Sequence, residues 1–168
     1  MGAEFYTVGK GVLSICEYTA TPAVWTPLGN ATNVQIEMVE TPLEHFESKT
    51  ARAAQDEEIV IRSGYNLSFT LDEVSKENLK IFVKATESNG VLQANTNLSQ
   101  KYALKFVSAN VNGPNRTWEF HKCKVTPNGA YSLISDEWTT LQFTAKGLAD
   151  YTGHASSPFF SVTGTTTA

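Results

Sequence analysis

The clearest hydrophobic pattern in the chain is an alternation between residues 59 and 71. Large apolar side chains fall on one parity and polar side chains on the other, as Ile59, Ile61, Tyr65, Leu67, Phe69 and Leu71 against Arg62, Asn66, Ser68 and Thr70. A period of two is typical of a half-buried β-strand. We therefore predict a strand here, with one face packed and the other in water.

A charged segment separates this strand from an earlier one. Val34, Ile36 and Met38 alternate with polar residues, and the sixteen residues from Thr41 to Asp56 then contain only two large apolar side chains. Loops of this length in compact domains are usually functional or disordered. Because it lies between two strongly patterned strands, we predict a long β-hairpin loop that becomes ordered against a partner.

Further strands are predicted at 5–18, 102–106, 118–125, 131–133 and 138–146, and a helix at 75–85. Ser75 is a suitable helix N-cap, and Asn89-Gly90 is interpreted as the helix end. About seven strands with one helix predict a mainly β fold, a β-sandwich or partly open barrel. We expect one domain over 1–150 and a Ser/Thr/Gly-rich C-terminal tail over 151–168, either mobile or docked late.

Composition narrows the function classes. Seventeen acidic and thirteen basic residues give a net charge of −4. A general nucleic-acid clamp is therefore disfavoured, because it needs a basic surface. The chain has no apolar run of membrane-spanning length and no secretory pattern after Met1. We therefore expect that it is made in the cytoplasm and does not insert into a membrane. Cys16 and Cys123 are then expected to stay reduced.

Catalytic motifs are missing from the sequence. There is no Gly-x-Ser-x-Gly or His-Glu-x-x-His pattern, and Gly9-Lys10-Gly11 lacks the spacing of a phosphate-binding loop. His121 and Cys123 have the parity of one strand face but no further ligands at suitable spacing, so we favour a core cysteine beside a surface histidine over a metal site. We expect neither an enzyme nor a cofactor, and interpret the carboxylates at Glu37, Glu40 and 56–58 as an electronegative rim.

Three tryptophans leave a second function class open. Trp25, Trp118 and Trp138 could stack on sugars, which would suit a soluble carbohydrate-binding β-sandwich module. A tryptophan in a strand more often packs in a core or an interface, because its large apolar area favours burial.

Several segments in fixed order resemble one known family. They are Leu28-Gly29-Asn30 before a strand, Glu40-Thr41-Pro42-Leu43-Glu44-His45-Phe46-Glu47-Ser48 at the start of the loop, Ser68-Phe69-Thr70-Leu71-Asp72-Glu73 leading to Glu77-Asn78-Leu79, Lys124-Val125-Thr126-Pro127-Asn128-Gly129, and the strand from Trp138 to Gly147. The chain thereby resembles the tail tube protein, or major tail protein, of long-tailed bacteriophages with non-contractile tails.

The resemblance implies a structural virion protein. Its subunits would form hexameric rings stacked into a hollow tube that conducts double-stranded DNA from head to host, without specific DNA binding. The implied partners are further copies of the chain, a tape-measure protein, a tail terminator and tail-tip proteins, and the implied location is the phage tail. Ring-forming tube proteins of secretion systems share the fold and remain an alternative within this class.

The resemblance also assigns roles to particular residues. In the family the long hairpin loop reaches the adjacent ring, which implies inter-ring contacts by Leu43, Glu44, Phe46, Glu47, Lys49 and Arg52, with Leu43 and Phe46 as apolar anchors. Family tubes tend to have an acidic lumen, and a negative wall repels phosphate so that DNA can slide. The lumen candidates are Glu37, Glu58, Asn66 and Ser68.

Overall fold

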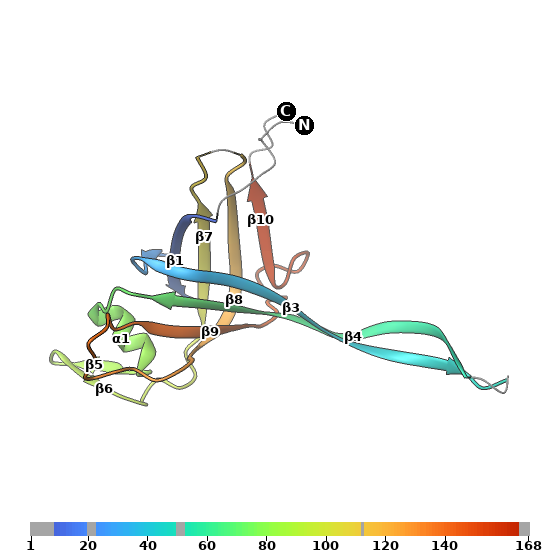
Figure 1. Ribbon diagram of the computed structural model, residues 1–168, viewed down its shortest axis with the longest axis horizontal. Helices are drawn as coiled ribbons and strands as arrows, with labels where there is room; N and C mark the ends of the chain where they lie inside the picture. Colours follow the sequence, from blue (N-terminus) through green and yellow to red (C-terminus); the bar gives the residue numbers. More distant parts are fainter. Residues whose placement is uncertain (1–8, 20–22, 50–52, 112, 165–168) are drawn as a thin grey trace.

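A computed structural model describes residues 9–19, 23–49, 53–111 and 113–164 (Figure 1). The fold is mainly β with one short helix, as predicted; eight strands form one antiparallel sheet that does not close into a barrel, and two more form a hairpin. The sheet order is β2-β1-β7-β8-β9-β4-β3, with β10 also paired to β8. The elements are β1 (Gly11–Glu17), β2 (Thr26–Pro27), β3 (Ala31–Glu47), β4 (Ala54–Leu71), α1 (Lys76–Phe82), β5 (Thr86–Ser88), β6 (Val91–Gln93), β7 (Tyr102–Ser108), β8 (Arg116–Pro127), β9 (Leu141–Gly147) and β10 (Phe160–Gly164).

Strand β8 makes the sheet curl. Its first residues pair with β10 and its last residues pair with β9. The register with β7 shifts between Tyr102 and Leu104, which places an extra residue in β8 close to His121. Such a bulge bends a strand and increases its twist, and in Figure 1 β7 and β8 cross the direction of β4 and β9. The inner face of the curled sheet therefore encloses the core.

Aromatic side chains from several strands fill that core. Phe69 stacks on Phe143 with ring centroids 5.2 Å apart, and Phe82 of the helix meets Phe143 edge-on. Tyr65 packs against Phe120. The Tyr65 ring fits there only because residue 147 is glycine, since a Cβ at that position would lie 2.2 Å from the ring. The buried apolar set is Leu13, Ile15, Leu28, Tyr65, Leu67, Phe69, Leu71, Leu104, Phe120, Cys123, Val125, Leu141, Phe143 and Ala145.

The helix begins as predicted and ends earlier. The Ser75 side chain accepts a hydrogen bond from the Asn78 backbone N–H, which confirms the N-cap. The helix ends at Phe82, and Asn89-Gly90 forms the turn of the β5–β6 hairpin with φ values of 51° and 78°. Two successive positive φ values are the requirement of a type I′ hairpin turn. The interpretation of these two residues as a helix end was therefore wrong.

The C-terminal part departs from two further predictions. Phe160–Gly164 is strand β10, paired with Arg116–Phe120, so this part of the predicted tail belongs to the sheet. The segment 131–140 contains no strand; the next strand starts at Leu141, and Trp138 is 95% exposed. Within the described ranges, no helix has the length and apolar character needed to cross a membrane.

A pair of stacked histidines holds the segment between β9 and β10 against the sheet. The rings of His121 and His154 lie parallel with centroids 3.6 Å apart, and the His121 backbone N–H donates to the Phe159 carbonyl. Burial lowers the pKa of His121, and nearby His154 lowers it further, against smaller opposite effects of Glu119 and Asp150. Protonation of the His121 ring therefore opposes the docking of the segment between β9 and β10 against the sheet.

Asp150 supplies a second contact of the same segment. Its Oδ1 accepts hydrogen bonds from the Tyr18 hydroxyl at 2.8 Å and from the Gly153 backbone N–H. Burial alone would raise the pKa of Asp150, but these hydrogen bonds and the nearby positive groups His154 and Lys122 bring the pKa below its usual value. The ionised carboxylate is thus the form that the fold stabilises.

Replacing Phe69 by Ala should lower the free energy of unfolding by about 3–5 kcal/mol, since a stacked and buried ring is lost and a cavity remains. Urea denaturation measures the change. Thr70→Ala, at the next and partly exposed position of β4, is the matched control and should cost under about 1 kcal/mol. Equal losses in both variants would contradict the assignment of Phe69 to the core.

Stability should also depend on pH through His121. Because its pKa is lowered in the folded protein, its contribution is present above the ordinary pKa of about 6.5 and is lost as the pH falls below it. The urea midpoint should therefore fall between about pH 7.5 and 5.5, and the fall should shrink in His121→Phe while persisting in His45→Gln. The Asp150 contribution is lost only at lower pH, below about 4. A midpoint in the original protein that does not change between the first two values would contradict this role of His121.

Candidate functional site

Strands β3 and β4 continue as a two-stranded ribbon well beyond the rest of the molecule (Figure 1). Pairing between β4 and β9 covers only Asn66 to Leu71, whereas pairing between β3 and β4 continues to Glu47 and Ala54. We call residues 38–64 the arm. The predicted loop at 41–56 is therefore mostly strand, since β3 continues to Glu47 and β4 starts at Ala54.

Apolar side chains lie exposed on both faces of the arm. Directly opposite residues of a ladder share a face, so the Leu43–Ile59 pair marks one face and the Pro42–Val60 pair marks the other. The seven large apolar side chains are between 41% and 56% exposed, namely Met38, Val39, Leu43, Phe46, Ile59, Val60 and Ile61. An isolated two-stranded ribbon is marginal in water, so this surface favours a partner.

Two irregularities interrupt the ladder of the arm. At each of them one extra residue in β4 exchanges the faces on which the next odd-numbered and even-numbered residues of that strand lie. The register passes from Thr41 opposite Arg62 to Pro42 opposite Val60, which leaves Ile61 as an extra residue. Proline has no N–H to donate, and within sheets it occurs at edges and bulges. The extra residue places Ile59 on the face opposite to that of Tyr65. The prediction that all six alternating apolar residues share one packed face was therefore wrong for Ile59 and Ile61, and Ile59 is 53% exposed.

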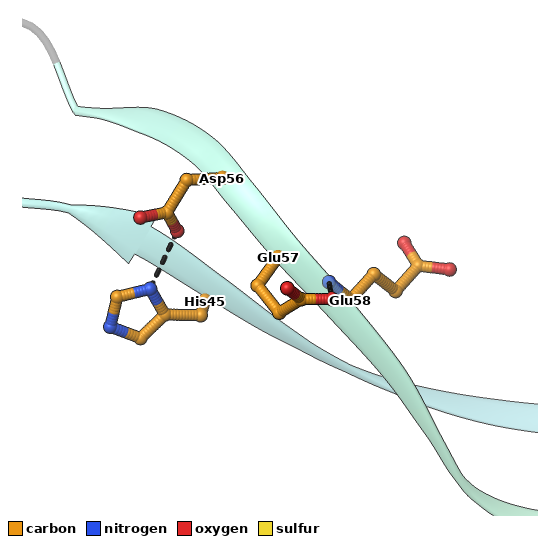
Figure 2. Close-up of polar contacts among 4 residues, drawn as sticks. All are labelled: His45, Asp56, Glu57 and Glu58. Carbon is orange, nitrogen blue, oxygen red and sulfur yellow. Dashed lines mark hydrogen bonds and ion pairs between the residues drawn. The ribbon is translucent and has the colours of Figure 1, made fainter.

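The arm is also the most acidic part of the chain. Residues 38–64 contain six acidic and three basic residues, so they hold three of the four net negative charges. Asp56, at the second irregularity, is bonded through Oδ1 to His45 Nδ1 at 2.6 Å (Figure 2). Glu57 and Glu58 follow it along β4, and Glu58 lies directly opposite Glu44. The two like charges repel each other across the ladder.

The predicted contact residues are all positions of this hairpin. Leu43, Glu44, Phe46 and Glu47 belong to β3 within the arm, Lys49 follows the end of β3, and Arg52 lies outside the described residues. Leu43 and Phe46 are about half exposed, which is the exposure that an anchoring side chain needs before it meets a partner. Their role in contacts between rings remains a prediction.

The four predicted lumen residues do not share one face. Glu37 lies opposite Asn66, and Ser68 follows Asn66 on the same outer face of the sheet. Glu58 lies on the other face, because the extra residue at Ile61 changes the parity between Glu58 and Asn66. The Glu37–Asn66 row continues through Lys146 of β9 to Lys124 of β8. This outer face is therefore polar and of mixed charge.

His121 and Cys123, which we considered as metal ligands and interpreted instead as a surface histidine beside a core cysteine, lie in different surroundings. The cysteine is in the core as expected, but the histidine is 6% exposed and therefore not at the surface. Cys123 is fully buried in the core, where burial raises the pKa of its thiol to about 12, whereas His121 stacks on His154. The alternation in the sequence predicts one strand face for His121 and Cys123, but the extra residue in β8 close to His121 breaks this alternation and separates them. Among the residues that the structure describes, no three His, Cys, Asp or Glu side chains gather where they could hold a metal ion.

The tryptophans also occupy different environments. Lys105 lies over the Trp25 ring at 4.3 Å, and Trp118 stacks on Phe160 beside the core. Lys105 and Phe106 point to opposite faces of β7, and Trp118 lies opposite Phe106 in the ladder. Trp25 and Trp118 are thus on opposite faces of the sheet and do not form a common platform for a sugar.

The comparison with known proteins gives a family without an established function. No curated protein matches the chain. The model of one family, described as "Protein of unknown function UCP028589", matches residues 6–91, which is just over half of the chain and includes the whole arm. The chain therefore belongs to the family of proteins of unknown function UCP028589.

Proposed function

We propose that the protein is a structural subunit that assembles with copies of itself into stacked hexameric rings, forming the hollow tail tube of a long-tailed bacteriophage. The tube conducts double-stranded DNA and performs no catalysis. The observation that carries this proposal is the arm, a long ribbon with exposed apolar side chains on both faces and little support from its own domain.

Free energy is the first argument for a partner. Fully burying one Val, Leu, Ile, Phe or Met side chain is worth about 1.5–3 kcal/mol, and seven such side chains are half exposed on the arm. A monomer gains nothing from ordering them in this way. A neighbouring copy that covered both faces would recover much of that free energy, which supports the arm as an assembly element.

The free edge of the sheet is the second argument. Strand β3 ends the sheet order, so its outer edge carries backbone groups with no strand partner among the described residues. Edges of this kind pair readily with other strands. Neighbouring subunits in a ring can join their sheets at such edges into a closed barrel. The part of the polar outer face formed by β3 and β4, with Glu37, Asn66 and Ser68, is then the proposed wall of the lumen. The part formed by β8 and β9, with Lys124 and Lys146, lies beside that wall, and Glu58, on the arm, is not part of it.

Electron microscopy and light scattering of the purified protein test the proposal. Stacked rings or tubes with a central channel are expected above a critical concentration. The double variant Leu43→Ser/Phe46→Ser should remain folded, since both side chains are exposed, yet raise that concentration by at least about tenfold, because every 1.4 kcal/mol of lost contact is a factor of ten.

Trp138→Ser is the control for the assembly measurement, because it removes an apolar side chain that is 95% exposed on the body of the molecule. This variant should assemble like the original protein. An original protein that stayed monomeric at every concentration would contradict the proposal.

A further inference from the structure

The described strand registers contain two pairs of like charges that lie directly opposite each other. One is acidic, Glu44 with Glu58 on the arm, and the other is basic, Lys124 of β8 with Lys146 of β9 on the body. All four side chains are exposed. Like charges directly opposite in a ladder are destabilising. Each pair thus destabilises the monomer, and the acidic pair and the basic pair are complementary in charge.

The basic pair has no counter-charge of its own. Neither Lys124 nor Lys146 takes part in an ion pair with the described residues. Three other lysines of the body are engaged: Lys76 with Glu87, Lys105 with the ring of Trp25, and Lys122 with the ring of Tyr18. Lys10, Lys80, Lys84 and Lys101 make no such contact with the described residues, but none of them lies directly opposite another lysine in a strand register. The Lys124–Lys146 pair is therefore available to an acidic partner.

A hollow beside Lys146 offers space for an apolar side chain as well. It has a volume of about 350 Å³ and lies where the arm leaves the body, between β4 and β9. Gly64 contributes no side chain to fill it, and a Cβ there would meet no atom within 4 Å. Its other lining includes Val39, Thr41, Arg62, Asn66, Lys146 and Gly147. A lysine pair next to a partly apolar hollow matches the arm, where Phe46 and Val60 lie on the same face as Glu44 and Glu58.

We infer that the arm of one copy docks on the outer sheet face of a second copy, with Glu44 and Glu58 on Lys124 and Lys146 and an apolar side chain of the arm in the hollow beside Lys146. This inference rests on the proposed function and names the contact between rings. The contact joins different surfaces of the two copies, so it repeats from copy to copy without closing on a dimer. It also covers two lysines that would otherwise attract DNA phosphates.

Charge reversal tests the contact. Glu44→Lys/Glu58→Lys gives a subunit with a basic arm and the original basic body; Lys124→Glu/Lys146→Glu gives one with an acidic body and the original acidic arm. Each variant alone should raise the critical concentration for assembly by about tenfold or more, since like charges then meet at the contact. Monomer folding is checked by circular dichroism and the urea midpoint.

Mixing the two variants is the decisive step. An equimolar mixture brings basic arms to acidic bodies and acidic arms to basic bodies, so tubes should form again, with both variants in equal amounts. The quadruple variant should also assemble. Assembly of the original protein should weaken as salt rises from about 0.05 to about 0.5 M, because the Debye length shortens.

Two control variants separate this contact from general charge effects. Asp136→Lys/Glu137→Lys and Lys10→Glu/Lys101→Glu make the same changes in net charge at other exposed positions of the body, and both should assemble like the original protein. Normal tubes from either reversed variant alone, or no recovery in the mixture, would overturn the inference and leave the proposed function standing. Failure of the original protein to assemble would instead overturn the proposed function.

Discussion

Strand β4 has partners on both edges only from Asn66 to Leu71, and most of the architecture follows from that limit. Where β9 is present, one face of β4 is buried in the curled sheet and Tyr65, Leu67, Phe69 and Leu71 reach the core. Where β9 stops, the ribbon has no layer to pack on, and similar side chains remain in water. One part of this continuous strand is therefore buried in the core, and the other part exposes apolar side chains that are free to contact a partner.

Much of the fold was predictable because its signals are local. Alternating apolar residues located β3, β4, β7 and β8, and the N-cap at Ser75 located the helix start. Asn89-Gly90 shows how a correct local signal can be assigned to the wrong element. The pair does require positive φ values, but the same requirement serves a helix end and a type I′ hairpin turn, and only the tertiary structure decides between them.

The errors at the candidate site have one physical origin. A single extra residue reverses the parity of everything beyond it, which moved Ile59 off the core face and separated Glu58 from Asn66. The extra residue in β8 similarly placed His121 and Cys123 in different surroundings. Pro42 was the available sign of the first irregularity, since a proline cannot continue a regular ladder. Nothing local signals the irregularity of the arm at Asp56. Strand β10 was missed because its apolar alternation covers only Phe160 and Val162, in a part of the chain rich in Gly, Ser and Thr.

The interrupted ladder of the arm has a consequence for solubility. A long, flat ribbon rich in Val, Ile and Leu would be a template on which any extended chain could add, the route by which proteins form disordered aggregates and amyloid. Pro42 removes one donor from β3, and the extra residues at Ile61 and Asp56 twist the ribbon out of the flat geometry that stacking requires. The arm can thus keep an adhesive surface in a crowded cell while admitting only a partner whose shape follows its irregularities.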